Sequence, residues 1–273
     1  MESRSKKSAR NILSGVICKL LLMIMAFATK TIFIRLLGVE YNGINGLYSN
    51  ILSILALSEL GVGNVLTFSL YNALKNNDQA KVCSLVNYFK KIYNLIAAAI
   101  LVIGIALVPI LNHIVNSNIP QNEVITYYIL YLLNSAASYL VVYKTTVIIA
   151  DQNGYISNVC DAVVTFMMYG TQIIYLFAFR NFFGYLVIQL LCTISKNIVL
   201  SIIADRMYPY LKQSKPKNDL VEKKQIFTNI KATFLYKISG VILNNTDNIL
   251  ISTIVGTVYV GYYSNYYMIV SYI

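Results

Sequence analysis

Residues 11–37 read NILSGVICKLLLMIMAFATKTIFIRLL, an apolar stretch that is interrupted by two lysines and one arginine. About 20 apolar residues in a helix cross the hydrocarbon core of a bilayer, so this stretch predicts a membrane-spanning helix. Lys19 and Lys30 lie 11 residues apart, about three helical turns, and therefore share one face of that helix. A cation inside a spanning helix costs about 2.5–3.5 kcal/mol on insertion scales, so we expect this face to line a bundle interior or a watery cavity.

The composition is typical of an all-α polytopic membrane protein. Of the 273 residues, 57% are hydrophobic and only 12% are charged, and the mean hydropathy is +0.61. The net charge of +11 does not indicate nucleic-acid binding, because most basic residues fall between apolar stretches, where membrane topology places them. The four cysteines are widely spaced and the chain has one histidine, so we expect neither a metal site nor a cofactor.

Apolar stretches separated by polar or glycine-rich turns predict about eight transmembrane helices. They lie at residues 11–37, 47–74, 84–111, 124–149, 159–179, 183–205, 229–255 and 257–273. Lysine and arginine gather at the amino terminus and in the connections 75–91 and 206–228, whereas the connection 112–123 has none. Positive residues mark the cytoplasmic side, so this alternation predicts a multi-pass protein with a cytoplasmic amino terminus.

A polar break divides the chain into two lobes. It contains Pro209, Pro216 and five lysines. We therefore predict a six-helix transmembrane lobe at 1–207, a basic cytoplasmic linker at 208–228, and the first two helices of a second lobe at 229–273. The last apolar stretch carries no closing basic residue, so we expect the chain to be truncated within the second lobe.

The two lobes begin with related sequences. A shift of 218 residues places Asn11, Ile12, Lys19, Ile24, Gly38, Tyr41 and Gly43 on Asn229, Ile230, Lys237, Ile242, Gly256, Tyr259 and Gly261. The match pairs the first predicted helix with the seventh, and both start on the same side of the membrane. This pattern predicts a parallel repeat of six helices, an arrangement in which two bundles rock about a central site.

Two segments carry a resemblance to a known family. The first is LGVEYNGINGLY at 37–48, followed by SELGVG at 58–63, and the second is NTDNILIS at 245–252, followed by Gly256 and VGYYS at 260–264. They resemble the opening hairpins of the two lobes in the Wzx-type oligosaccharide flippases of the multidrug/oligosaccharidyl-lipid/polysaccharide exporter superfamily. The resemblance implies a non-enzymatic bacterial plasma-membrane protein that moves polyprenyl-pyrophosphate-linked oligosaccharide from the inner to the outer leaflet for polysaccharide biosynthesis.

Such a cargo would give the intramembrane lysines a role. A pyrophosphate cannot cross hydrocarbon without counter-charge, and ammonium groups in a cavity can supply it. The candidates for this contact are Lys19, Lys30, Lys237 and Lys196. The alternative for Lys19 and Lys30 is that their long side chains extend to the nearest membrane surface and have no contact with a cargo.

Acidic and amide side chains in the predicted helices also admit two interpretations. Glu59, Asp247 and Asp161 are candidates for coupling transport to H⁺ or Na⁺, or for structural ion pairs with nearby lysines. Amides recur at helical spacing, and the candidates for contacts with the sugars are Asn134, Gln189, Asn244 and Asn248. The alternative is that these amides join helices by hydrogen bonds worth under about 1–2 kcal/mol each.

Three other functions stay open at this stage. A cation-coupled drug exporter of the same superfamily would favour acidic residues in the cavity, whereas the first helix is cationic. A membrane enzyme that handles polyprenyl-phosphate sugars is a different class, and the chain has no metal-ligand cluster or D-x-D arrangement that would point to it. The third alternative is an inactive truncated fragment.

Overall fold

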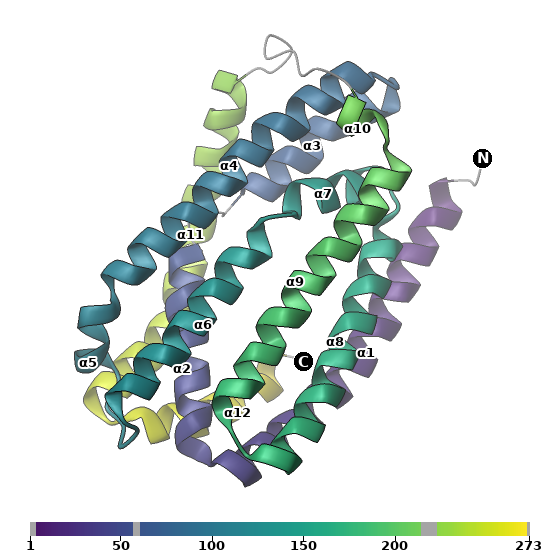
Figure 1. The fold of residues 1–273 in the computed structure, drawn as a ribbon. Coiled ribbons are helices and arrows are strands. Elements are labelled where there is room, and N and C mark those ends of the chain that lie inside the picture. The colour runs from purple at the N-terminus through teal and green to yellow at the C-terminus, as the bar shows by residue number, and fades with distance from the viewer. Residues whose placement is uncertain (1–3, 57–60, 214–222, 272–273) are drawn as a thin grey trace.

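The computed structural model describes residues 4–56, 61–213 and 223–271, and every regular element in these residues is a helix. The elements are α1 Arg4–Leu37, α2 Val39–Leu55, α3 Val62–Lys75, α4 Gln79–Ala106, the short 3₁₀ helix η2 Val108–Ile110, α5 Leu111–Ile114, α6 Gln121–Tyr139, α7 Val142–Ala150, α8 Gly154–Phe179, α9 Phe182–Met207, α10 Tyr210–Gln213, α11 Lys223–Ile254 and α12 Thr257–Ser271 (Figure 1). The predicted all-α fold is confirmed.

Within the described residues, four helical stretches are long and apolar enough to cross a membrane. They are Gly15–Leu37, Gln79–Ile110, Gly154–Phe179 and Phe182–Met207. The pair α6 and α7 makes a fifth span if the two are counted together, and they meet at a bend of 42°. The predicted number of about eight spans is not confirmed, because α2, α3 and α12 have only 17, 14 and 15 residues, and α11 includes many polar side chains.

Two of the predicted boundaries are wrong. Residues 38–46 were expected to form a turn, but only Gly38 is non-helical and α2 already begins at Val39. The predicted helix 47–74 is interrupted, because α2 ends at Leu55 and α3 begins after Gly61. Gly61 has φ 95°, a left-handed conformation that glycine adopts without steric cost, and it is the N-cap of α3.

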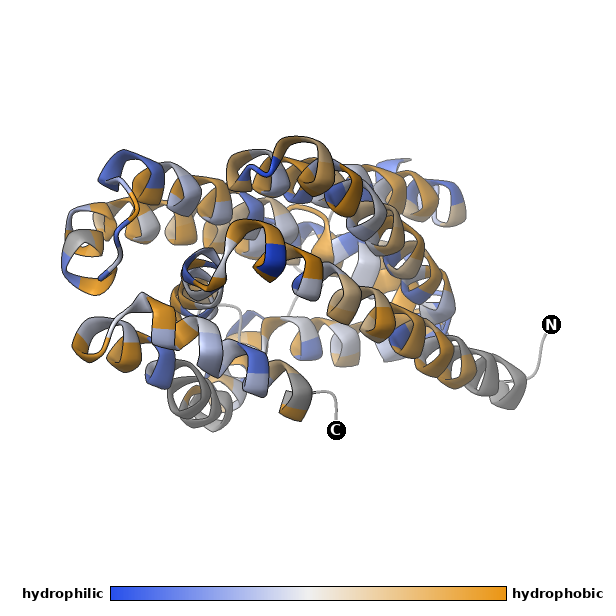
Figure 2. Cartoon of the chain, turned by 90° about the horizontal axis from the view of Figure 1, so that it is seen from below, coloured by the Kyte–Doolittle hydropathy of each residue, from blue (hydrophilic) through white to orange (hydrophobic). Residues whose placement is uncertain are grey.

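The long helices pack side by side into a bundle. Helix α1 packs on α8, α8 on α9, α9 on α6 and α6 on α4, while α2 contacts α6, α11 and α12 (Figure 1). Apolar residues run along the helices in Figure 2, and large apolar side chains such as Leu95, Val102 and Ile174 are exposed on the outside. Such a surface would be unfavourable in water but suits the hydrocarbon of a bilayer, which agrees with a multi-pass membrane protein.

Two hairpins, α1–α2 and α11–α12, share the same joint. Gly38 connects the first pair with φ 99°, and Gly256 connects the second with φ 125°. The helices after these joints start at Val39 and Thr257, which correspond at the shift of 218 residues found in the sequence. Both joints need a positive φ, which a residue with a Cβ rarely adopts.

Helices α2 and α12 pack against each other through a reciprocal glycine contact. A Cβ at Gly43 would collide with the carbonyl oxygen of Thr257, and a Cβ at Gly261 would collide with the carbonyl oxygen of Val39. Gly43 and Gly261 correspond at the shift of 218, and so do Val39 and Thr257. The contact therefore has approximate two-fold symmetry. Each glycine lets the first turn of the other helix approach closely.

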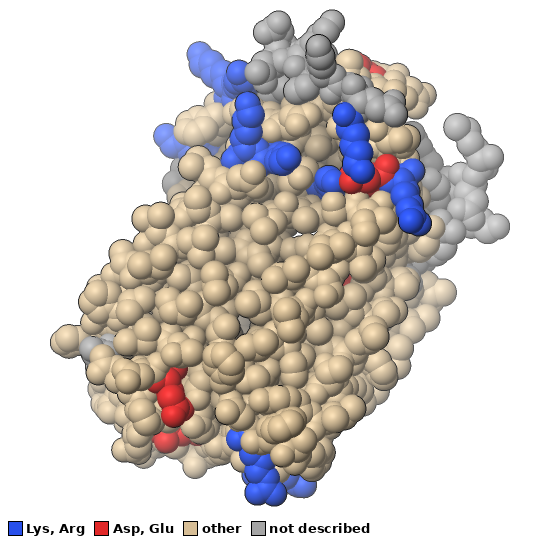
Figure 3. Space-filling view, viewed as in Figure 1, with Lys and Arg blue, Asp and Glu red and all other residues tan. Residues whose placement is uncertain are grey.

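The two ends of the bundle differ in charge. We call the end with α10 and the Asn76–Asp78 turn the linker end, and the end with the Gly38 and Gly256 joints the hairpin end (Figure 1). Lysine and arginine side chains gather at the linker end (Figure 3). There Asp205 lies 2.6 Å from Lys144 and 3.0 Å from Lys212, which ties α7, α9 and α10 together.

Candidate functional site

A partly open cavity of about 220 Å³ lies between the helices, where α1, α2 and α12 meet α8 and α9. It is lined by Ala26, Thr29, Lys30 and Phe33 of α1, Asn42 and Asn45 of α2, Tyr169 of α8, Tyr185 of α9 and Met268 of α12. We call it the Lys30 cavity. At roughly 30 Å³ for each water molecule, it has room for a phosphate-sized group rather than for a whole oligosaccharide.

Lys30 is the only cation that lines this cavity among the described residues. Its ammonium donates a hydrogen bond of 3.0 Å to the carbonyl oxygen of Ser264 on α12. A lysine ammonium carries three N–H donors, and this bond uses one of them, so the same group can also donate to a bound anion. The half-buried side chain of Lys30 thus lines a hollow between helices, whereas its contact with an anionic ligand stays a prediction.

Asn42 forms a second bond between the first hairpin and α12. Its side-chain amide is 1% exposed and donates to the carbonyl oxygen of Gly261 at 2.8 Å. In both inter-hairpin bonds a side chain of the first hairpin is the donor, and a backbone carbonyl of α12 is the acceptor. Asn45 lies one turn further along α2, where its side-chain oxygen accepts a hydrogen bond from the hydroxyl of Tyr131.

Aromatic rings close the side of the cavity toward α9. The ring of Phe33 meets that of Tyr185 edge to face, with 5.0 Å between centroids, and packs in the same way on Phe182 at 5.4 Å. Gln172 donates to the carbonyl oxygen of Tyr185 at 3.2 Å, which fixes α8 against α9 at this level. Rings, amides and one ammonium together form a surface that can hold a phosphate and the polar edge of an attached sugar.

The other basic candidates do not reach this cavity. The side chain of Lys19 is exposed on α1, outside the residues that line the cavity. Lys196 on α9 lies 3.1 Å from Asp161 on α8, so these two candidates form an ion pair with each other. The predicted pyrophosphate role of Lys196 and the predicted coupling role of Asp161 thus compete with a structural pairing between adjacent helices.

The amide candidates are spread over three helices. Asn134 on α6 and Asn248 on α11 each have a buried side-chain oxygen without a hydrogen-bond partner, but neither lines the Lys30 cavity. Gln189 on α9 is half-buried, one turn beyond Tyr185. The acidic candidate Asp247 accepts a hydrogen bond of 2.9 Å from the hydroxyl of Tyr263, and this bond joins α11 to α12.

Three candidates fall outside what the structure describes. Glu59 lies in the undescribed segment 57–60, and the side chains of Lys237 and Asn244 on α11 also lie outside the described part. Within the described residues, no group of three or more His, Cys, Asp or Glu side chains could hold a metal ion.

Sequence reasoning missed most of the residues around Lys30. Asn42 and Asn45 were assigned to a turn, whereas the start of α2 at Val39 places them three residues apart on one helical face. Tyr169 and Tyr185 carry no local signal, because only the packing of α1 against α8 and α9 brings them to this cavity.

The comparisons with known proteins bear on the fold. No protein-family model matches the chain, and no curated protein matches it. The chain is similar to a solved structure named "protein A", with a TM-score of 0.70 and 14% sequence identity. This similarity covers 100% of the present chain and 62% of the solved chain, so the present chain spans less than two thirds of that protein's length. At this identity the similarity is one of fold alone.

Proposed function

We propose that the protein is a flippase that moves polyprenyl-pyrophosphate-linked oligosaccharide across a bacterial plasma membrane, from the cytoplasmic to the outer leaflet. The observation that carries the proposal is the position of Lys30, a half-buried ammonium in a hollow between apolar helices, beside amides and tyrosines, where the α1–α2 hairpin meets α12. Placing a charged lysine within the membrane costs free energy, so we infer that an anionic ligand accounts for a lysine at this position.

Electrostatics supports pyrophosphate as the group that Lys30 contacts. An ammonium and a phosphate oxygen attract each other more strongly in a cavity surrounded by hydrocarbon than in water, because the effective dielectric constant is lower. The small cavity would take the charged group, while the sugars would extend beyond it toward half-buried polar residues such as Gln189. The polyprenyl chain would stay in the surrounding lipid.

The charge distribution supports an orientation. Most lysine and arginine side chains in Figure 3 gather at the linker end, and the connection between η2 and α6 at the hairpin end has no lysine or arginine. The rule that positive residues stay inside then makes the linker end and the amino terminus cytoplasmic. The Lys30 cavity lies toward the hairpin end of α1, nearer to the outer leaflet.

The wider architecture belongs to the same proposal. We infer that residues 1–207 form a six-helix lobe and that α11 and α12 open a second, related lobe. The common glycine joints and the reciprocal contact of Gly43 and Gly261 support this arrangement. Alternating access would then need the α2–α12 contact to open, and H⁺ or Na⁺ could drive that step. The drug-exporter alternative is less well supported, because Asp161 is paired with Lys196.

Translocation in proteoliposomes tests the proposal. A fluorescent lipid-linked oligosaccharide is placed in the membrane, and its arrival in the far leaflet is followed by protection from an added glycosidase. We expect Lys30→Met to abolish transport, Lys30→Arg to retain part of it, and Lys19→Ala to have a smaller effect, since Lys19 lies outside the cavity. The same assay with Lys237→Ala tests the repeat-related lysine. Equal rates for wild type and Lys30→Met, at equal protein levels, would reject the function proposed here.

A further inference from the structure

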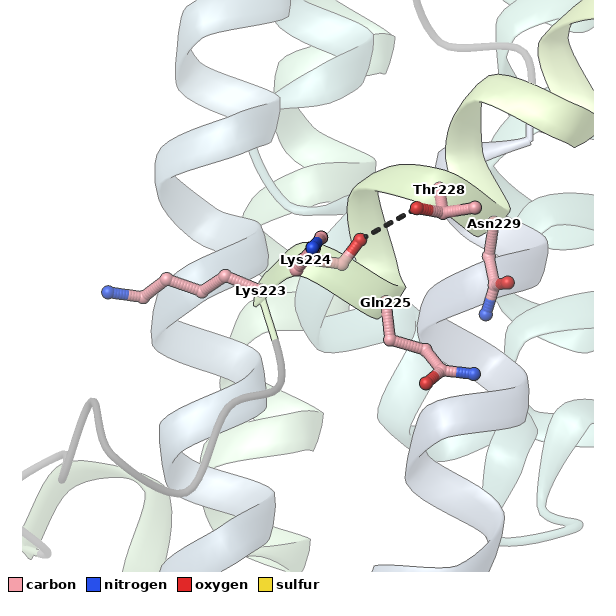
Figure 4. A pocket seen from close by; sticks show the side chains of 5 residues that line it. All are labelled: Lys223, Lys224, Gln225, Thr228 and Asn229. Atoms are coloured by element: carbon pink, nitrogen blue, oxygen red, sulfur yellow. Dashed lines mark hydrogen bonds between the residues drawn. The ribbon is translucent and has the colours of Figure 1, made fainter.

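A second polar cavity lies at the linker end, between α3, α4 and α11, away from the Lys30 cavity. It measures about 220 Å³ and is lined by Phe68, Ser69, Asn72, Lys81, Leu85, Gln225, Ile226 and Asn229. A more open hollow of about 590 Å³ adjoins it and shares Gln225 and Asn229 (Figure 4).

The lining of the smaller cavity is rich in hydrogen-bond donors. Lys81 contributes an ammonium, and the amides of Asn72, Gln225 and Asn229 contribute N–H groups from α3 and α11. Figure 4 shows the amides of Gln225 and Asn229 on the same side of α11, one turn apart, while Lys223 extends away from them. No acidic side chain lines either cavity among the described residues. One ammonium surrounded by neutral hydrogen-bond donors is suited to a ligand that carries a single negative charge.

The same cavity has apolar side chains, Phe68, Leu85 and Ile226, beside its polar ones. Phe68 is 69% exposed, and its ring meets that of Tyr71 edge to face at 5.9 Å. Tyr71 is 45% exposed, and exposed tyrosine rings near the end of a helix bundle are typical of the boundary between headgroups and hydrocarbon. A ligand here would therefore touch polar groups with one part and apolar rings with another.

We infer that this cavity binds the headgroup of an anionic phospholipid. The monoanionic phosphodiester would accept hydrogen bonds from Lys81 and the amides, and the acyl chains would lie along Phe68. The cavity lies between α3, α4 and α11, so a bound lipid would link α3 and α4 to α11 at the end opposite the glycine joints. It does not depend on the function proposed for the Lys30 cavity.

Thermal stabilisation of the detergent-purified protein tests the inference. Short-chain phosphatidylglycerol is titrated against phosphatidylcholine of the same chain length, with wild type, Lys81→Gln, Asn229→Asp and the control Lys91→Gln. Lys91 is an exposed lysine on α4 outside both cavities. We expect Lys81→Gln to weaken the apparent affinity for phosphatidylglycerol about tenfold, since a hydrogen-bonded charge is removed. Asn229→Asp, which places a negative charge at an exposed position, should weaken it at least as much, and Lys91→Gln should not.

Three results would overturn the inference. The first is an equal rise in melting temperature with phosphatidylglycerol and phosphatidylcholine. The second is an equal loss of phosphatidylglycerol affinity in Lys81→Gln and Lys91→Gln. The third is full stabilisation by water-soluble glycerol 3-phosphate at the concentration at which phosphatidylglycerol saturates. The first would mean no charge recognition, the second a general attraction to basic residues, and the third an aqueous anion site rather than a lipid site.

Discussion

The α1–α2 and α11–α12 hairpins have the same joint but different polar groups. Lys30 corresponds to Asn248 at the shift of 218 residues, so the first hairpin carries a charge where the second carries a buried neutral amide. In two described hydrogen bonds between them, Lys30 and Asn42 of the first hairpin donate to backbone carbonyls of α12. The glycine packing is thus common to both hairpins, while among the described side chains the polar groups at these corresponding positions differ. Substitutions at the glycine contact test what the two hairpins have in common, and substitutions at the polar side chains test how they differ.

The largest effect on stability is expected at the shared glycine contact. Gly43→Ala would place a methyl group against the carbonyl oxygen of Thr257, a backbone atom that cannot move aside, so we expect a loss of about 1–3 kcal/mol or more. The matched control is Gly170→Ala on α8, where a Cβ meets nothing within 4 Å. The control should be neutral or stabilising by about 0.5–1 kcal/mol, because alanine favours a helix.

Thermal unfolding of the purified protein in detergent measures both variants. If the contact is reciprocal, Gly261→Ala should behave like Gly43→Ala, because its methyl group would meet the carbonyl oxygen of Val39. Equal melting temperatures for Gly43→Ala and Gly170→Ala would show that the hairpins do not pack as closely as described.

An intermediate effect is expected from the hydrogen bonds between the first hairpin and α12. Asn42→Leu removes the bond to the carbonyl oxygen of Gly261 and should destabilise the protein by about 1 kcal/mol, the net worth of a typical hydrogen bond. Ser53→Ala is a suitable control, because the hydroxyl of Ser53 is exposed and donates only within its own helix, to Ser49. Backbone amide hydrogen exchange in α12 measures how firmly α12 packs on the first hairpin. The exchange rate should rise in Asn42→Leu and stay unchanged in Ser53→Ala. Unchanged exchange there would argue against the bond as a link between hairpins.

The smallest effect is expected at the ion pair of Lys196 and Asp161. The side chains of Lys196 and Asp161 are 33% and 44% exposed, so we expect the pair to contribute only about 0.2–1 kcal/mol. A double-mutant cycle with Asp161→Asn and Lys196→Gln measures this coupling from melting temperatures. A transport defect in Asp161→Asn that the second substitution does not repair would instead restore Asp161 as a coupling residue.

Local pattern was sufficient to predict the long apolar helices, and insufficient for the elements between them. The helices α8 and α9 lie within about five residues of their predicted bounds, because long apolar runs are a strong signal. The start of α2 was missed because Gly43 and Gly46 resembled turn residues, whereas both lie in a helix and allow close approach of α12. Composition cannot distinguish these two uses of glycine.

The candidate site was predictable in part for a related reason. Lys30 could be identified because a cation in an apolar run is conspicuous in a sequence. Its neighbours Tyr169 and Tyr185 come from helices more than a hundred residues away, so only the tertiary packing brings them together. Lys196 and Asp161 were both singled out, but nothing local in the sequence indicated that they pair with each other.

The central claim is that the ammonium of Lys30 is the group that binds pyrophosphate. The most direct test is the affinity of the detergent-purified protein for a polyprenyl diphosphate, compared between wild type, Lys30→Met and the control Lys91→Met. We expect Lys30→Met to weaken binding by about 10- to 100-fold, as the loss of a charge-assisted hydrogen bond would, while Lys91→Met stays near wild type. Wild-type affinity in a folded Lys30→Met protein would contradict the claim.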